Sequence, residues 1–352
     1  MNKYIGFDMD SKKTVCCVVE AGQKERYRTI GPDIESMIKF LKAEKKGGYR
    51  VEIVFEISGQ AGFIYDSLIS YVDDIKVANP SKMTWIYRTA KKNDRIDARK
   101  MAVLLSIGEI PEVYMPSKEV RQWRERLLHR KKIVCKVVQV KNRIRATFKS
   151  QGYSKPANKG GWWKKANRVW MQSVCEASAG ISDLWHMHVS NLLDELELLD
   201  AQLKRVTQYL DRQPGGKLLM SIPGVGPRTS EAVLAYTDDV RRFGNYKQYC
   251  SYFGLTPKLD ESGDSRRIGH ISKRGPSIVR WVICESSWKV IRKSKSLREF
   301  YERVMAGQKQ RKKIAIIAVA RKLLSIMRAM QLTGELFNEE LVNRVVEARQ
   351  VA

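Results

Sequence analysis

The sequence has little acidic charge for its size and no long apolar run. Its 352 residues hold 38 Asp and Glu against 65 Lys and Arg, a formal net charge of +27. So large an excess repels itself in the compact state, so a polyanionic partner is expected. No apolar stretch approaches the roughly 20 residues that span a bilayer, and residues 1–10 show no signal-peptide pattern. Nucleic acid in the cytoplasm is therefore favoured over a membrane surface.

The sequence also lacks the cysteine and histidine patterns that are typical of disulfides and zinc sites. The six cysteines include no Cys-x-x-C pair, which argues against disulfides and a structural zinc site. Cys16 and Cys17 are neighbours on an expected strand and should face opposite ways. His186 and His188 lie in a stretch that reads as helical, where side chains two residues apart diverge. Hydrophobic residues make up 43% of the chain, enough for two or three domains with sizeable cores.

Residues 1–116 are expected to form an α/β domain. Three short apolar stretches joined by tight turns predict antiparallel strands, and helices then alternate with further strands. Strands are expected at 4–8, 14–19, 25–30, 51–55 and 75–77, and helices near 33–41, 63–71 and 94–100. This order of elements resembles the ribonuclease H and RuvC-like fold.

Four acids are placed where such a domain could gather them. Asp94 and Asp97 are three residues apart, so on a helix they lie one above the other, and they repel unless a cation is held between them. Asp8 and Glu56 follow the first and fourth expected strands. Such a set could hold two Mg²⁺ ions about 3.5–4 Å apart, which would clamp a phosphodiester. Each acid taken alone could instead have an ordinary structural position, in a turn, at a solvated strand end or at the start of a helix.

These acids carry a family resemblance. Asp8, Glu56 and the run Lys-x-Asp-x-x-Asp-Ala at 92–98 resemble the acidic tetrad of the DEDD insertion-sequence transposases. This insertion sequence 110 family also contains the Piv-type DNA invertases. The resemblance implies a RuvC-like catalytic domain in which all four acids hold Mg²⁺.

Residues 117–212 predict a helical coiled-coil arm. Two long helices keep a seven-residue apolar rhythm, with Lys and Arg outnumbering Glu twelve to two between 118 and 149. That excess favours an arm that faces nucleic acid over a neutral spacer. The basic insert at 154–170 contains Trp162, Trp163 and Trp170. These side chains could stack on unpaired bases or form a hydrophobic plug on the coiled coil.

Residues 213–352 predict a mainly helical third domain. Ile222 to Thr229 reads Ile-Pro-Gly-Val-Gly-Pro-Arg-Thr, a helix-hairpin-helix signature. Gly224 and Gly226 permit its tight turn, and the following helix start, with Arg228, is expected to grip a DNA phosphate. An ordinary Gly-rich turn between helices is the alternative.

The segment 222–280 resembles the transposase domain of the same family. It contains Gly-Leu-Thr-Pro at 254–257, Ser-Gly at 262–263 and Ile-Ser-Lys-Arg-Gly at 271–275. In that family the serine of the Ser-Gly pair attacks DNA, so the resemblance assigns this role to Ser262, with Ser265 as the second candidate. Nearby cations would stabilise the negative charge of a phosphorane transition state: Arg266, Arg267, Lys273, Arg274 and Arg280.

The resemblance as a whole implies a prokaryotic, nucleoid-associated transposase that cuts and rejoins double-stranded donor and target DNA. A transient phosphoserine link would conserve the bond energy, and a bridge RNA would supply sequence specificity. A dimer or tetramer is implied too, with the tetrad of one subunit facing the serine of another. Three alternatives remain: a DNA invertase of the same family, a metal-dependent structure-selective nuclease, and a non-catalytic nucleic-acid-binding protein.

Overall fold

The computed structural model describes residues 1–83, 93–156, 160–177, 183–211, 216–262 and 265–340. The chain divides into two compact units, Met1–Arg121 and Gln122–Ala352, and each is described by itself. Among the described helices, none combines the length and the apolar character that a membrane span requires.

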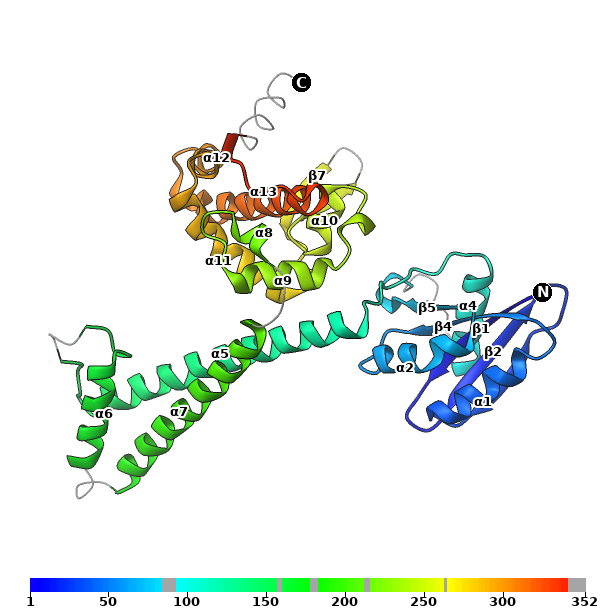
Figure 1. Ribbon diagram of the computed structural model, residues 1–352, viewed down its shortest axis with the longest axis horizontal. Helices are drawn as coiled ribbons and strands as arrows, with labels where there is room; N and C mark the ends of the chain where they lie inside the picture. Colours follow the sequence, from blue (N-terminus) through cyan, green and yellow to red (C-terminus); the bar gives the residue numbers. More distant parts are fainter. Residues whose placement is uncertain (84–92, 157–159, 178–182, 212–215, 263–264, 341–352) are drawn as a thin grey trace. The chain divides into compact units, whose positions relative to one another are not determined.

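The N-terminal unit is built on a five-stranded mixed sheet (Figure 1) in the order β3-β2-β1-β4-β5. The first three strands are antiparallel, and the last two run parallel to the first. The mixed α/β class and the expected order of elements are confirmed. The strands are β1 (Asn2–Met9), β2 (Thr14–Glu20), β3 (Arg26–Ile30), β4 (Arg50–Glu56) and β5 (Asp74–Ala78).

Helices cover both faces of this sheet because the strands bury side chains on both. Cys16 packs under α1 (Ile34–Glu44) and α2 (Ala61–Leu68), whereas Cys17 packs against α4 (Asp94–Ser106). The two cysteines therefore face opposite ways, as the period of a strand requires. Short 3₁₀ turns at Ile69–Tyr71 and Pro80–Lys82 complete the unit.

Helix α1 is fixed at both of its ends. Asp33 caps its start by accepting a hydrogen bond from the backbone N–H of Ser36 at 2.8 Å, as the sequence predicts. At its last turn the Glu44 carboxylate pairs with buried Lys3 at 3.0 Å and with Arg26 at 2.8 Å. These pairs join the helix to β1 and to the edge strand β3.

Helix α4 lies unusually close to β1 at Gly6. A Cβ atom added to Gly6 would collide with the carbonyl oxygen of Ala98 and would stand 2.8 Å from the backbone nitrogen of Ala102. Both obstacles are helix backbone, which cannot rotate away as a side chain can. Glycine is therefore required here, and it sets the height of α4 above the sheet.

The C-terminal unit contains most of α5 (Lys118–Ser150), which packs along α7 (Asp183–Asp211). Arg130 donates to the Thr207 hydroxyl at 3.1 Å and Arg143 lies 3.8 Å from Glu195, so the two helices run antiparallel. The seven-residue apolar pattern of α5 predicts an inward-facing Val134, but Ile133 is the buried residue and Val134 is partly exposed. That α5 and α7 form a coiled coil stays a prediction.

The tryptophan-rich insert packs inward. Trp162, Trp163 and Trp170 contact the hydrophobic cluster at the end of α5 and α7, and Trp170 belongs to α6 (Lys165–Ala177). The ring centroids of Trp162 and Trp170 lie 6.3 and 5.5 Å from that of buried Phe148. Of the two interpretations of this insert, the structure supports the plug.

The rest of the unit is mainly helical, as predicted, around the buried helix α13 (Lys312–Thr333). Its one described hairpin, β6 (Pro257–Ser262) with β7 (Ser265–Ile271), is antiparallel. The remaining helices are α8 (Lys217–Met220), α9 (Pro227–Thr237), α10 (Tyr246–Tyr252), α11 (Ser277–Lys293) and α12 (Lys295–Met305), with 3₁₀ turns at Val240–Arg242 and Lys309–Arg311.

The substitution Gly6→Ala is expected to lower the free energy of unfolding of the N-terminal unit by about 3 kcal/mol, because its methyl group must push α4 off the sheet. Hydrogen exchange of the β1 amides, followed by mass spectrometry, measures this loss. Gly59→Ala is the matched control, because a Cβ at Gly59 meets no atom within 4 Å. Equal protection of β1 in both variants would contradict the close packing.

Candidate active site

Asp8 and Glu56 lie at the same end of the sheet. Strands β1 and β4 are parallel neighbours, and their register pairs Phe7 with Phe55, so the two acids follow side by side. Both acids, with Asp10 and Gln60, line a cavity of about 320 Å³. Two acids that the sequence separates by 48 positions are thereby brought to one site.

The same two acids belong to the sheet face that α4 covers. Tyr4 and Val54 pack against the α4 side chains Met101 and Leu105. Because strand side chains alternate, positions four residues after Tyr4 and two after Val54 fall on that same face. Asp8 and Glu56 are those positions, and both are partly exposed.

Asp94 and Asp97 form the first turn of α4. Asn93 caps the helix by accepting a hydrogen bond from the backbone N–H of Arg95 at 3.0 Å, which fixes the start of the helix at Asp94. Both aspartates are partly buried. Ala98, which contacts Gly6, directly follows Asp97, so this turn lies next to the strand that contains Asp8. The neighbouring Lys91 and Lys92 lie outside the described residues.

Lys13 places an ammonium group among these acids. Its Nζ lies 2.7 Å from Asp94 Oδ2, with about half of each side chain exposed. The hydrogen bond to Asp94 and the charges of Asp94, Asp10 and Asp8 hold the pKa of Lys13 above its usual value. The chain thus supplies a cation of its own at the acidic end of the sheet.

The chemistry of the four acids suits a hard divalent ion, because carboxylate oxygens are the ligands that Mg²⁺ and Mn²⁺ prefer. Lys13 shows that positive charge is stable at Asp94. In the part of the chain that the structure describes, however, no three Asp, Glu, His or Cys side chains stand close enough to form a ready metal cage. Asp8 and Glu56 would hold an ion from the strand ends, and Asp94 and Asp97 from α4.

Ser262 and Ser265 end the two strands of the β6–β7 hairpin. They are register partners, and residues 263–264 between them lie outside the described residues. The backbone places both candidate nucleophiles, with Arg266 and Arg267 next along β7, at the tip of one hairpin. Their roles stay predictions.

The base of this hairpin is fixed by two glycines of the family motifs. A Cβ at Gly254 would collide with the Arg274 carbonyl, and one at Gly275 would collide with the Tyr252 carbonyl. Both glycines have positive φ, +68° and +76°, which other residues rarely adopt. The Lys273 amide also donates to the Gly254 carbonyl at 3.1 Å. The two glycines therefore allow the loops that contain Gly254 and Gly275 to pack closely at the base of the hairpin.

Arg280 also connects these two loops. Its guanidinium donates to the carbonyls of Phe253, Arg274 and Gly275 at 3.2, 2.8 and 2.9 Å. The sequence predicts a phosphate contact for Arg280, yet its described hydrogen bonds serve the fold. Lys273 and Arg274 are exposed beside it.

The predicted helix-hairpin-helix turn is packed into the unit. Gly224 has φ +101°, and a Cβ there would lie 2.9 Å from the backbone nitrogen of Val290 on α11. Gly226 precedes α9, and no atom lies within 4 Å of a Cβ built there. Gly224 therefore serves packing, and Gly226 at the start of α9 is the more open of the two glycines.

Arg228 is engaged by acids within its own unit. It pairs with Glu231 at 2.7 Å and also with Asp211 at the end of α7. Burial of Glu231 raises the pKa of its carboxyl to about 7, although Arg228 opposes this shift. Arg228 is thus already paired where the sequence predicts a phosphate contact.

Sequence reasoning missed Gly6 and Lys13. The available signal for Gly6 was a glycine inside an apolar strand, which indicates close approach of another backbone. For Lys13 no signal existed, because its distance to Asp94 depends on how α4 packs.

Two family models match this chain. The DEDD transposase model of IS110 elements matches residues 5–151, and the model described as "Transposase IS116/IS110/IS902 family" matches residues 216–302. A probable family 20 transposase of Pseudomonas aeruginosa is 25% identical over 241 residues, which are 65% of this chain and 69% of that protein.

Two further relatives widen the comparison. The transposase for insertion sequence element IS1111A of Coxiella burnetii is 21% identical over 69% of this chain and 67% of its own length. The pilin gene-inverting protein of Moraxella bovis is 30% identical over 41% of this chain and 44% of its own length. The two family models match separate parts of the sequence, one containing the four acids and the other containing Ser262. The chain belongs to the insertion sequence 110 family of transposases.

Proposed function

We propose that this transposase cuts and rejoins DNA through a phosphoserine link formed by Ser262, with Mg²⁺ held by Asp8, Glu56, Asp94 and Asp97. The observation that supports it best is the meeting of two strand-end acids, Asp8 and Glu56, in the lining of one cavity at the end of the sheet. The family match of both regions supports the division into an acidic site and a serine.

In the proposed reaction the Ser262 oxygen bonds to a DNA phosphorus while the bond from that phosphorus to one deoxyribose oxygen breaks. The serine proton passes to a carboxylate base, and the leaving oxygen takes up a proton. Rejoining reverses these transfers with a different DNA end, so no outside energy source is needed. Bound Mg²⁺ would supply charge neutralisation at the phosphate. The chain's own part is to orient the acids on β1, β4 and α4.

The remaining parts of the proposal follow the family resemblance. A bridge RNA would pair with donor and target DNA, which leaves the protein to bind backbone and shape. The tetrad of one subunit would face Ser262 of another, in a dimer or tetramer. Gly226 at the helix start, together with exposed Lys273 and Arg274, would contact phosphates.

DNA inversion is the second candidate, favoured by the 30% identity to the pilin gene-inverting protein. The strand chemistry would be the same for both. Joining two sites within one molecule inverts the segment between them, whereas joining an element to a new site moves it.

Ser262→Ala is expected to abolish a denaturant-resistant protein–DNA adduct that wild type forms, because no other oxygen replaces the nucleophile. The assay uses a labelled DNA junction of the element, Mg²⁺ and the copurifying RNA. Ser265→Ala, the matched control on the facing strand, should keep the adduct. Cleavage by wild type without any adduct would support a metal-dependent nuclease and remove Ser262 from the chemistry.

Lys13→Met is expected to tighten Mn²⁺ binding about two- to fivefold, because the exposed Lys13 ammonium no longer competes with the metal ion for Asp94. Isothermal titration calorimetry measures this affinity without any DNA. Lys12→Met removes the same charge one residue away and should change the affinity little. Equal tightening in both variants would mean that the ammonium does not occupy the metal's place.

A further inference from the structure

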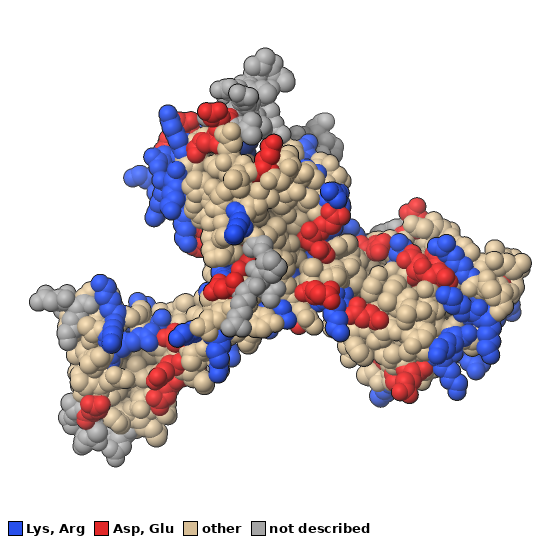
Figure 2. Space-filling view, viewed as in Figure 1, with Lys and Arg blue, Asp and Glu red and all other residues tan. Residues whose placement is uncertain are grey.

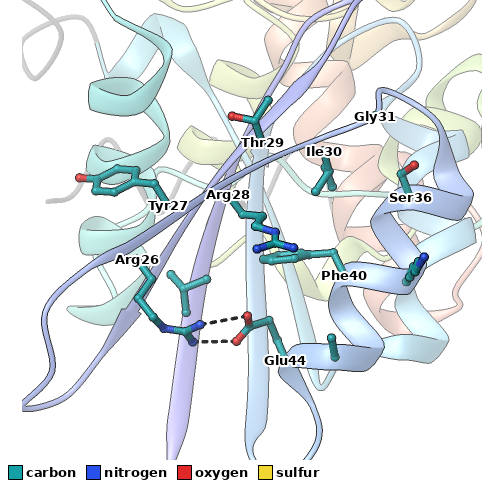
Figure 3. A pocket seen from close by; sticks show the side chains of 12 residues that line it. Arg26, Tyr27, Arg28, Thr29, Ile30, Gly31, Ser36, Phe40 and Glu44 are labelled. Carbon is teal, nitrogen blue, oxygen red and sulfur yellow. Dashed lines mark hydrogen bonds and ion pairs between the residues drawn. The ribbon is translucent and has the colours of Figure 1, made fainter.

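A groove lies on the other side of the same sheet, between the edge strand β3 and α1 (Figure 3). Its cavity measures about 840 Å³, a volume in the range of organic-ligand sites. The groove exists because β3 is the last strand on its side of the sheet, so nothing in the described sheet continues beyond it. Arg26 and Arg28 of β3 face Phe40 and Glu44 of α1 across the opening (Figure 3).

The groove has an excess of positive charge. Three cations line it, Arg26, Arg28 and Lys39, against the single carboxylate of Glu44. That carboxylate is saturated, because it accepts from Arg26 at 2.8 and 3.3 Å and from the Lys3 ammonium at 3.0 Å. Glu44 therefore has little capacity left to neutralise the other two cations.

Arg28 and Lys39 are the two groove cations that Glu44 does not neutralise. Both are exposed, and among the described residues neither makes an ion pair. Several other cations of the unit pair with carboxylates within 4 Å: Lys45 with Asp73, Arg50 with Glu52, Lys76 with Glu112 and Arg99 with Glu25. A group of Lys and Arg side chains also covers one side of this unit in Figure 2.

The floor between these two cations is apolar. Phe40 and Val18 line it with largely buried side chains, Ile30 is partly exposed, and Ser36 lies at one end. Two cations above a narrow apolar floor suit a ligand that has spaced anionic groups and an apolar edge between them. An unpaired nucleotide strand has both, because its phosphates bind cations and its sugars and bases can lie against apolar side chains. In a duplex the bases are paired and stacked, so a duplex offers its phosphates but not its bases.

We propose that the groove between β3 and α1 binds unpaired nucleotides, with Arg28 and Lys39 contacting successive phosphates and the Phe40 side lying against a base or sugar. This site rests on the proposed function only in that the chain acts on nucleic acid. It is separate from the acids, which lie on the face that α4 covers.

The test measures binding of the full chain to labelled 20-residue oligo(dT), oligo(rU) and a 20-base-pair duplex by fluorescence anisotropy from 50 to 300 mM salt. Arg28→Ser with Lys39→Ser should weaken single-strand binding on the order of tenfold at 100 mM salt. It should also lower the log–log salt slope by about 1.4, since two phosphate contacts are lost. Duplex affinity should change much less. The oligonucleotide that loses more shows whether DNA or RNA is the natural strand.

Lys24→Ser with Lys46→Ser is the matched control, because both lysines are exposed in the same unit and lie outside the groove lining. Equal losses in the two double variants, or equal losses for duplex and single strand, would overturn the proposal and leave only general charge attraction. Circular dichroism confirms that each variant is folded. The binding assay requires no strand cleavage, so failure of the Ser262 adduct assay leaves this test intact.

Discussion

The contact between α4 and Gly6 is the constraint on which the N-terminal unit depends. Without a side chain at Gly6, helix backbone rests against strand backbone at Ala98 and Ala102. Because Ala98 directly follows Asp97, this contact also positions the first turn of α4 next to the strand that contains Asp8. On our proposal, a side chain at Gly6 would lift that turn and move Asp94 and Asp97 away from Asp8 and Glu56. The packing of α4 and the position of its two aspartates therefore both depend on the absence of a Cβ atom at Gly6.

Gathering carboxylates has an electrostatic cost that the chain offsets locally. Acids at neighbouring strand ends and on one helix turn repel each other in the folded state. Lys13 reduces that repulsion by pairing with Asp94, and the raised pKa of its ammonium reports the acids around it. Because the pair is half exposed, it is weak enough to exchange. A permanent buried ion pair would bind Asp94 too firmly for a metal ion to replace it.

The sequence predicted what depends on local pattern and missed what depends on packing. The order of strands and helices along the chain, the start of α1 at Asp33 and the helical spacing of Asp94 and Asp97 all follow from neighbours in the chain. The tryptophans of the insert looked equally suited to bases, and only the position of Phe148 shows that they pack inward. Likewise Arg228 and Arg280 read as phosphate contacts, because a sequence does not show which carbonyls or acids already engage them.

Alternation along the strands places the strand-end acids and the groove cations on different faces of the small sheet. Tyr4, Gly6 and Asp8 fall on the α4 face, whereas Arg26, Arg28 and Ile30 of β3 face α1. On our proposals, one face would hold the phosphate to be cut, which requires metal ions to overcome the acids' repulsion. The other face would hold a strand through its phosphates with no metal at all. Nucleic acid can then be bound tightly in the absence of Mg²⁺, while the acidic end accepts a phosphate only once cations are present.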